Sequence, residues 1–260
     1  MSIDWFDIKI RDSIRGFGAD AILADCKVNA TATSTPATCG LVNRDPGGSL
    51  WLTSGGYVID LPSNRGSQQT RGLEFNGSYI QPVGEAGKLT LTFNGTYLDA
   101  YKVNNGLTQP YDCAGLYGPV CSKGGTVSSG APLPRWRHKA RLGWQLPSGI
   151  GLSAQWRYIG SVRAETTVNN QSLKGANNFN PGLRIPVFSY FDLAANATVA
   201  TGFNFRIGVN NLLDKQPPFV TSGGPAGSNL CPSGPCNGNT YPAVYDALGR
   251  YLYAGFTLDF

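Results

Sequence analysis

The six cysteines are the residues of this chain whose type and spacing predict chemistry most directly. They fall into three local pairs, which are Cys26 with Cys39, Cys113 with Cys121, and Cys231 with Cys236. Many connectivities are possible for six cysteines, and proximity favours the local one. Disulfides persist in oxidising compartments, so this pairing predicts an exported protein. The alternative for Cys231-Pro-Ser-Gly-Pro-Cys236 is a redox or metal site, although a metal needs a second pair of ligands.

Catalytic motifs are not evident in the sequence. There is one histidine, His138, which argues against most histidine-based metal sites and catalytic triads. The chain lacks a phosphate-binding Gly-x-x-x-x-Gly-Lys-Ser/Thr loop, a His-Glu-x-x-His motif and a Gly-x-Ser-x-Gly elbow. Carboxylate pairs of the glycosidase type meet only in space, and no two carboxylates stand out here. We therefore expect no enzyme activity, no cofactor and no resident metal.

A basic row is the other chemically distinctive feature. Arg135, Arg137, Lys139 and Arg141 alternate with the apolar or aromatic residues Trp136, His138, Ala140, Leu142 and Trp144. Side chains alternate between the two faces of a strand, so the four cations should share one face. Few inward carboxylates are available to them, namely Glu74, Asp192 and Asp259. Unpaired cations are costly in a narrow interior, so we expect the basic row to face a wide, wet lumen.

Period-two alternation predicts that eight strands position these residues. The expected strands cover residues 2–10, 71–81, 88–102, 135–146, 150–162, 186–198, 203–211 and 248–260. The connections between them alternate between short turns and long loops, and all six cysteines fall in long loops. A short helix is expected at 19–26 and an extended piece at 50–60.

Composition favours a membrane β-barrel. Charged residues make up only 14% of the chain, glycine is abundant with 34 residues, and mean hydropathy is −0.16. No apolar run of about 18 residues exists, so no transmembrane helix is expected. We predict an all-β, antiparallel, up-and-down transmembrane barrel segment with short periplasmic turns and long extracellular loops. The net charge of +5 fits contact with lipopolysaccharide or an anionic ligand, and no nucleic-acid motif accompanies it.

Several stretches resemble TonB-dependent outer-membrane receptors. The most specific are Phe203–Phe219, with its Asn-Asn-Leu-Leu-Asp-Lys-Gln-Pro-Pro sequence, and Tyr245–Phe260, with its Tyr-Asp, Gly-Arg and terminal Phe. Ile3–Ile10, Thr70–Phe75 and Pro134–Arg141 are similar to the same family. The resemblance implies energised uptake of a scarce nutrient, such as a metal chelate, cobalamin or a saccharide. It also implies that Ala254, Phe256, Leu258 and Phe260 form the signal to the barrel-assembly machinery.

Departures from that family predict an incomplete barrel. Family members have about 22 strands around a plug, whereas the sequence predicts eight strands and contains no plug, TonB-contacting box or signal peptide. We therefore expect residues 1–260 to be the C-terminal part of a receptor barrel in the outer membrane of a Gram-negative bacterium, and we do not expect this part to transport a nutrient alone. The expected partners are outer-membrane lipid and lipopolysaccharide, the barrel-assembly machinery, and TonB only through the missing plug; the substrate is not predicted.

Two alternatives remain open at this point. One is a self-closed, eight-stranded structural or adhesive outer-membrane barrel. The other is a secreted, soluble β-domain that binds sugars on the loop aromatics Trp51, Tyr111, Tyr117 and Tyr241. The remaining aromatics are expected to form interface belts or to pack on the lipid face; they are Tyr97, Trp136, Trp144, Trp156, Tyr158, Tyr251 and Tyr253.

Overall fold

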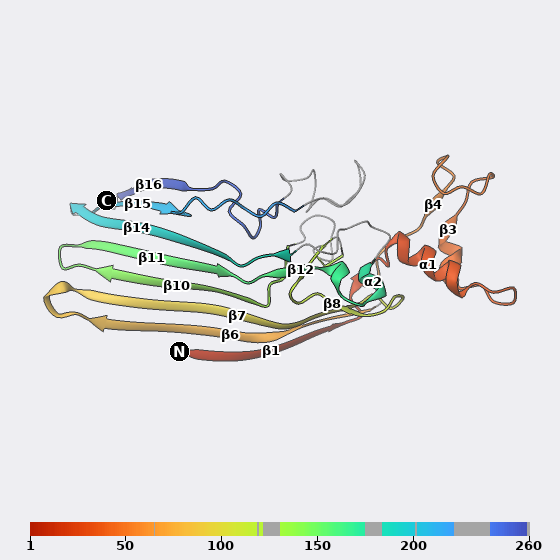
Figure 1. Cartoon of the computed structure of the whole chain (residues 1–260), viewed down its shortest axis with the longest axis horizontal. Helices are drawn as coiled ribbons and strands as arrows, with labels where there is room; N and C mark the ends of the chain where they lie inside the picture. The colour runs from red at the N-terminus through yellow and green to blue at the C-terminus, as the bar shows by residue number, and fades with distance from the viewer. Residues whose placement is uncertain are drawn as a thin grey trace.

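The computed structural model describes residues 1–64, 66–118, 120–121, 131–174, 184–200, 202–220 and 240–258. Its main feature is one antiparallel sheet in which eight long strands lie in chain order (Figure 1). These strands are β1 (Ser2–Arg11), β6 (Ser67–Pro82), β7 (Lys88–Asn104), β10 (Trp136–Gln145), β11 (Ile150–Ile159), β14 (Phe188–Ala200), β15 (Phe203–Asn210) and β16 (Tyr251–Leu258). The predicted all-β, up-and-down antiparallel architecture is therefore confirmed.

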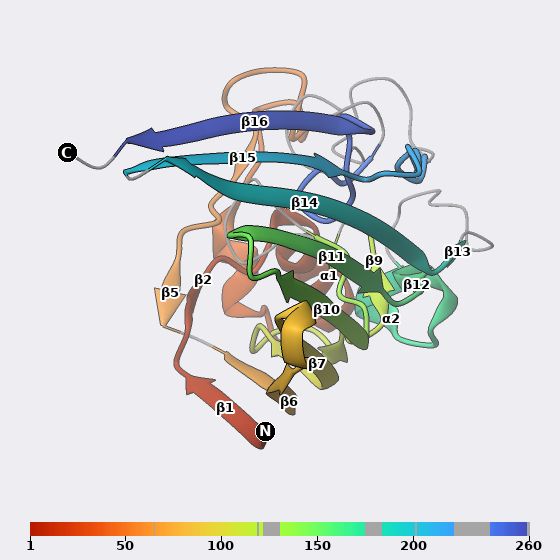
Figure 2. The ribbon, with the colours of Figure 1, turned by 90° about the vertical axis from the view of Figure 1, so that its left-hand side faces the viewer.

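The sheet is open. Among the strands that the structure describes, β1 pairs only with β6, and β16 pairs only with β15. Figure 2 shows the strands side by side in an arc with β1 and β16 at its two ends. The prediction of a part barrel is confirmed, and the self-closed eight-stranded alternative finds no support.

Short turns gather at one end of the sheet and long loops at the other (Figure 1). The β6–β7 turn contains η2 (Gly84–Ala86) and is closed by a hydrogen bond from Val83 N to Gly87 O of 2.8 Å. Gly87 has φ 99°, and a Cβ there would collide with the Gln145 carbonyl oxygen of β10. Glycine is needed at this position because the backbone is left-handed and the neighbouring strand is close.

Small elements occupy the long loops. They are β2 (Ile14–Arg15), α1 (Ala19–Asn29), η1 (Ala37–Leu41), β3 (Val42–Asn43), β4 (Tyr57–Val58) and β5 (Ser63–Asn64) in the first; β8 (Tyr111–Asp112) and β9 (Leu116–Tyr117) in the second; and β12 (Val162–Ala164), η3 (Glu165–Thr167), α2 (Gln171–Lys174) and β13 (Arg184–Ile185) in the third. The expected helix is α1, whereas the extended piece at 50–60 shortens to β4. None of the helices in the described ranges is long and apolar enough to cross a membrane.

One face of the sheet is apolar on all eight strands, as the pairing register shows. It consists of Ile3, Trp5, Leu73, Phe75, Tyr79, Leu89, Leu91, Phe93, Tyr97, Trp136, His138, Ala140, Leu142, Trp144, Ile150, Leu152, Ala154, Trp156, Tyr158, Phe191, Leu193, Ala195, Ala197, Phe203, Phe205, Ile207, Val209, Leu252, Ala254, Phe256 and Leu258. Leu142 is 48% exposed and Phe256 70% exposed. A contiguous exposed apolar surface of this extent marks contact with lipid or another apolar partner. On β7 it spans residues 89–97, close to the length of roughly 9–11 residues that a tilted strand needs to cross a bilayer.

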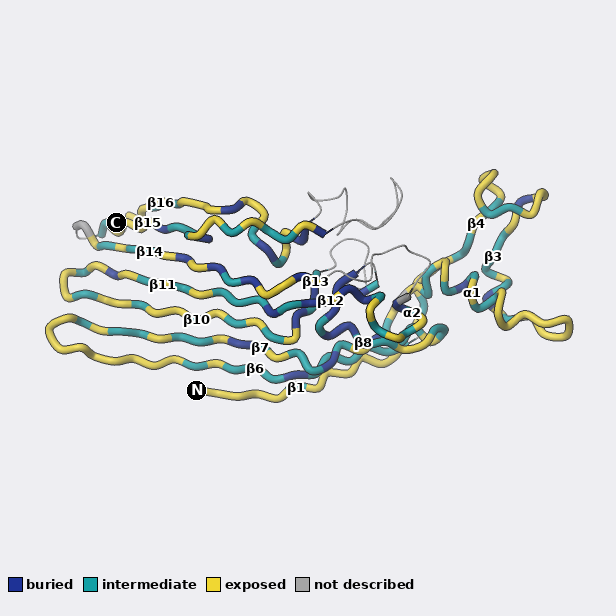
Figure 3. The backbone as a smooth tube through the Cα atoms, viewed as in Figure 1, coloured by how far each residue is buried: buried dark blue, intermediate teal, exposed yellow. Residues whose placement is uncertain are grey.

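The opposite face is polar. It consists mainly of Glu74, Asn76, Ser78, Thr92, Asn94, Thr96, Arg137, Lys139, Arg141, Ser153, Gln155, Arg157, Asp192, Asn196, Asn204, Arg206, Asn210, Tyr251, Tyr253 and Thr257. The buried residues concentrate at the loop end of the sheet, which is darkest in Figure 3. The sheet therefore acts as a wall between two environments, and the packed core lies among the loops.

A β-bulge interrupts the wall near the loop end. The register between β6 and β7 shifts between Arg71 and Gly72, which pair with Ala100 and Leu98, so Asp99 is the extra residue. A Cβ on Gly72 would meet the Tyr97 carbonyl oxygen and the Phe6 ring, which explains the glycine. The Asp99 carboxylate pairs with Arg71, at 2.6 Å from its Nε and 2.5 Å from its Nη2. Bulges strengthen local twist and re-aim side chains, and here one presents a carboxylate.

Candidate functional site

The best-defined polar site lies where the polar face meets the long loops, and we call it the rim site. At its centre the Arg157 guanidinium of β11 bridges two carboxylates. Its Nε and Nη2 lie 2.7 and 2.9 Å from the two oxygens of Asp192 on β14. Its Nη1 and Nη2 lie 2.8 and 2.6 Å from the two oxygens of Asp246, which belongs to the segment before β16. Such paired, charge-assisted bonds fix both distance and orientation.

Asp192 and Arg157 have further partners. Asp192 also accepts hydrogen bonds from Gln155 Nε2 at 3.1 Å and from the backbone N–H of Asn211 at 2.8 Å. The Arg157 guanidinium lies 4.8 Å from the centroid of the Tyr190 ring. The side chains of Arg157 and Asp192 are only 20% and 10% exposed. A charged cluster that is half removed from water is stable only when it is satisfied in this way.

The Asn-Asn-Leu-Leu-Asp-Lys sequence forms the turn beside the rim site. Asn211 and Asp214 both have φ 52°, a left-handed conformation that Asn and Asp tolerate better than other residues. Asn211 clamps the turn, since its side chain accepts from Lys215 N at 2.9 Å and donates to Lys215 O at 3.0 Å. Asp214 accepts from the N–H of Arg250 at 2.8 Å, directly before β16. The sequence therefore specifies how the chain leaves β15 and returns to β16.

A pocket of about 550 Å³ opens beside the rim site. Its walls come from Gln155, Arg157 and Asp192 on the polar face, and from the 242–251 segment, including Asp246 and Tyr251. Because Arg157 already binds both carboxylates, the pocket presents carboxylate lone pairs, amide groups and a tyrosine rather than a free cation. Within the described ranges no group of three or more His, Cys, Asp or Glu residues is arranged to hold a metal.

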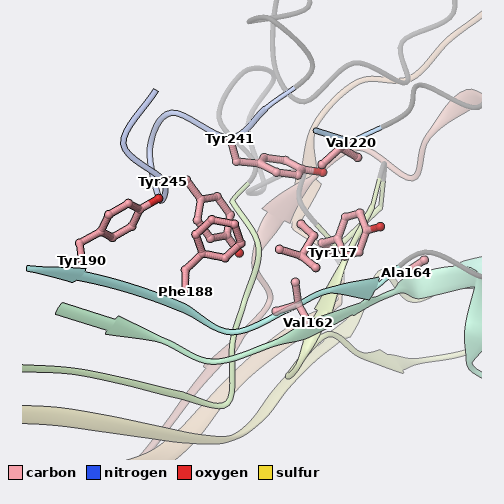
Figure 4. Close-up of a cluster of buried hydrophobic side chains, with 9 residues drawn as sticks. Tyr117, Val162, Ala164, Phe188, Tyr190, Val220, Tyr241 and Tyr245 are labelled. Carbon is pink, nitrogen blue, oxygen red and sulfur yellow. The ribbon is translucent and has the colours of Figure 1, made fainter. Parts of the chain in front are cut away.

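Buried aromatic residues hold the loops together above the rim site (Figure 4). Tyr117, Val162, Ala164, Ile185, Phe188, Tyr190, Val220, Tyr241 and Tyr245 form one cluster. Tyr117 and Tyr241 are 1% and 4% exposed, and their rings meet edge to face at 6.2 Å. Burial raises the pKa of Tyr117 to about 12 and raises the pKa of Tyr245 well above its usual value. These tyrosines form a core that joins three loops.

A disulfide-closed loop packs against this cluster. Cys113 and Cys121 are joined, and both are buried together with Leu116 and Leu173. The buried Glu165 carboxylate accepts from the N–H of Cys121 at 2.6 Å and from the N–H of Val120 at 2.9 Å. A Cβ on Gly118 would overlap the Glu165 side chain. The disulfide therefore closes the second long loop on itself, and the buried Glu165 carboxylate joins the third long loop to it.

The first long loop carries the other observed disulfide, between Cys26 in α1 and Cys39 in η1. Its outer part is ordered by Asp45, whose carboxylate accepts from Ser49 N at 2.8 Å and from Thr53 Oγ1 at 3.1 Å. Trp51 stands on this turn and is 80% exposed. Figure 1 shows the first loop extending farther from the sheet than the other labelled elements.

Two of the three predicted cysteine pairs are confirmed, and the third, Cys231 with Cys236, lies outside the described residues. The carbohydrate platform is wrong for Tyr117 and Tyr241, because both are buried in the loop core, and Tyr111 packs beside the second disulfide. Tyr251 and Tyr253 pair with Asn210 and Gly208 on the polar face, so they are not part of a lipid-facing belt.

Three of the four residues of the predicted basic row share one face of the sheet, and the fourth lies outside the strand. Arg137, Lys139 and Arg141 lie on the polar face of β10, opposite Thr96, Asn94 and Thr92 of β7. Arg135 precedes β10, and its Nη1 donates to the carbonyl oxygen of Asp99 at 2.6 Å. Within the described part of the chain none of the four forms an ion pair.

The terminal apolar residues keep their predicted alternation as far as the structure describes them. Ala254, Phe256 and Leu258 lie on the apolar face of β16, and Phe260 lies outside the described residues.

Sequence reasoning missed the rim site, because its members are 35 and 89 residues apart along the chain. The only local signals were the Tyr245-Asp246 pair and the Asn-Asn-Leu-Leu-Asp-Lys stretch, which had been noted for their resemblance rather than for any contact. Large side chains of the apolar face, such as Leu142 and Phe256, remain exposed, which argues against the soluble, sugar-binding alternative.

Comparison with known proteins places these features in context. The family described as TonB dependent receptor-like, beta-barrel matches residues 1–212. No curated protein matches the chain. Among solved structures, a ferric enterobactin receptor mutant from Pseudomonas aeruginosa is 16% identical with a TM-score of 0.57, and the match covers 99% of this chain and 28% of the receptor.

Two further structures give similar results. The siderophore receptor PirA from Acinetobacter baumannii is 13% identical over 99% of this chain and 29% of its own, with a TM-score of 0.50. The FrpB iron transporter from Neisseria meningitidis is 14% identical over 99% of this chain and 27% of its own, also with a TM-score of 0.50. At these identities the likeness concerns the fold, and the chain spans less than a third of the length of these three proteins.

Proposed function

The chain belongs to the TonB dependent receptor-like β-barrel family, a family of Gram-negative outer-membrane proteins, and from this we propose that it forms part of the wall of a receptor for energised nutrient uptake. One observation carries the proposal. The sheet has one apolar face on all eight strands and an opposite face that is mainly polar on the seven strands from β6 to β16, with its long loops at one end. Such a sheet suits a wall between lipid and a water-filled lumen.

The open edges support a larger barrel. An unpaired strand edge in lipid leaves backbone groups without hydrogen bonds, so β1 and β16 need partners. In the proposed receptor, further strands complete the wall, the short turns face the periplasm and the long loops face outside. Arg137, Lys139 and Arg141 then face a wide lumen, where water or a plug domain satisfies them.

The proposed nutrient is a ferric chelate. The solved structures of similar fold include proteins described as a ferric enterobactin receptor, a siderophore receptor and an iron transporter. Cobalamin and saccharides are the competing substrate classes. The receptor would engage TonB through its plug, contact outer-membrane lipid and lipopolysaccharide on the apolar face, and be recognised by the barrel-assembly machinery through Ala254, Phe256, Leu258 and Phe260.

Uptake by living cells tests this proposal. The gene is deleted, cells are starved of iron, and uptake of radiolabelled ferric enterobactin is compared with and without TonB. We expect uptake to depend on both the gene and TonB. Uptake that is unchanged by the deletion and persists without TonB would refute the proposal. Gene- and TonB-dependent uptake of cobalamin instead of iron would keep the transport function and change the substrate class.

A further inference from the structure

Charged residues replace apolar ones abruptly at the loop end of the apolar face. Trp5 of β1 pairs with Leu73 of β6, which pairs with Tyr97 of β7, and Tyr97 pairs with Trp136 of β10. Aromatic residues in such a row are typical of the boundary between hydrocarbon and headgroups. Trp144, near the other end of the band, donates from Nε1 to the Ala86 carbonyl oxygen of the short turn at 2.8 Å. The apolar band is therefore bounded by aromatics at both ends.

Beyond the Trp5 row, the same face carries three exposed cations. Lys9 of β1 is directly opposite Gln69 of β6, which is opposite Lys102 of β7. Arg11 follows one row farther out, opposite Ser67. We propose that Lys9, Arg11 and Lys102 form a binding site for the phosphorylated headgroups of outer-leaflet lipid, and we call it the headgroup site. The inference rests on the proposed placement of the long loops outside the cell.

Three carboxylates of this region are already engaged. Asp7 accepts from Gln69 Nε2 at 2.6 Å and lies 3.6 Å from Lys9 Nζ. Asp99 is held by Arg71, as described above. Asp112, which is opposite Lys102 in the β7–β8 pair, accepts at one oxygen from the N–H groups of Tyr101 and Ala114, both at 2.9 Å.

This arrangement leaves Arg11 and Lys102 open to an external anion, whereas Lys9 shares its exposed position with Asp7. Arg71, on the same face, is already engaged, because it binds Asp99 and its guanidinium lies 5.9 Å from the Trp5 ring. Arg11 and Lys102 form no ion pair with any residue in the described ranges. Exposed cations just above an apolar band attract anionic headgroups, each contributing a modest and roughly additive amount.

Position identifies the ligand as a lipid headgroup. The headgroup site shares its face with the apolar band, and beyond the aromatic row only the row of Asp7, Arg71 and Ala100 lies between the two. A soluble anion would have no reason to bind above an apolar surface, whereas a phosphorylated lipid places its chains against that surface and its phosphate beside the cations. Arg137, Lys139 and Arg141, which are equally exposed and basic, face away from this surface and serve as the control.

The test measures binding of diphosphoryl lipid A to the full chain, extracted from outer membranes in mild detergent and washed free of lipid. One variant carries Lys9→Gln, Arg11→Gln and Lys102→Gln. The matched control carries Arg137→Gln, Lys139→Gln and Arg141→Gln, which removes the same charge from the polar face. A Lys9→Arg, Lys102→Arg variant keeps the charge, and heat-modifiable gel migration verifies that each protein is folded.

We expect the first variant to lose about a hundredfold in affinity, from three cations near the surface, and the control to change less than about threefold. The arginine variant should bind as the parent does, and monophosphoryl lipid A should bind more weakly. Equal losses in both glutamine variants, or no loss in the first, would overturn the headgroup site. Full displacement of the lipid by inorganic phosphate would reassign it to a free anion. A failure of iron uptake in cells leaves these binding results unaffected, so the two proposals fail separately.

Discussion

Replacement of Asp246 by alanine should release the segment before β16 from the polar face. Asp246 joins that segment to the sheet through two hydrogen bonds to Arg157, of 2.8 and 2.6 Å. Hydrogen bonds to charged groups contribute about 1.5–3 kcal/mol each. The Asp246 side chain is 23% exposed, so we take the lower end of this range. We expect the free energy of local opening of the segment to fall by about 2–3 kcal/mol in total. Arg157 keeps Asp192 as its partner, so the sheet itself should remain intact.

Hydrogen–deuterium exchange measures this opening directly. The N–H groups of Val244 and Tyr245 both donate to the Tyr241 carbonyl oxygen at 2.9 Å and report on the segment. A loss of about 2–3 kcal/mol raises their exchange rate by about 30- to 150-fold. Glu85→Ala, an exposed carboxylate in the short β6–β7 turn, is the control and should have no effect on this segment. A rise below about threefold, or an equal rise in β10, would refute the reasoning.

Three further predictions concern other parts of the molecule. Leu142→Arg on the apolar face should destabilise the membrane-inserted chain by about 2–4 kcal/mol in urea titrations from vesicles, whereas Thr92→Arg on the opposite face of the neighbouring strand should cost little. Gly208→Ala should cost about 1–3 kcal/mol in the same titration, because its Cβ would overlap the Tyr253 ring. Tyr117→Phe should reduce the phenolate absorbance change near pH 12 by the share of one tyrosine. Because burial raises the pKa of Tyr117 in the folded state, its contribution to stability is fully present below about pH 10 and is lost between about pH 10 and 12.

Each of these has a clear contrary result. Equal destabilisation by Leu142→Arg and Thr92→Arg would mean that the two faces do not separate lipid from water. A Gly208→Ala variant as stable as the parent would mean that Tyr253 does not pack over that backbone. A high-pH transition of undiminished amplitude in Tyr117→Phe would mean that Tyr117 does not contribute to it.

The strands of the sheet and their order were predictable because the sequence pattern that marks each strand is local. A strand with one apolar face shows alternation within a few residues, and each hairpin joins neighbours in sequence, so the order from β1 to β16 follows from the chain itself. The cysteine pairs were predictable for the same reason, since the two observed disulfides close loops with separations of 13 and 8 residues. Open edges were expected from the number of strands.

The loop architecture was not predictable, because its contacts are distant in sequence. The Arg157–Asp246 pair joins residues 89 apart, and no period or spacing marks it. Tyr117 and Tyr241 looked like exposed loop aromatics, since burial in a core made of loops has no repeating pattern. The bulge at Asp99 was also missed, because one inserted residue leaves the alternation on either side unchanged.

The two observed disulfides each close within a single long loop, and neither joins one strand to another. Oxidation of these thiols therefore demands no particular order of strand insertion, and it can be complete while the polypeptide is still in the periplasm. A reductant that reaches these disulfides would loosen the first and second long loops. It would leave the hydrogen bonds between the strands of the sheet unaltered. Formation of these two disulfides therefore places no constraint on how the strands enter the membrane.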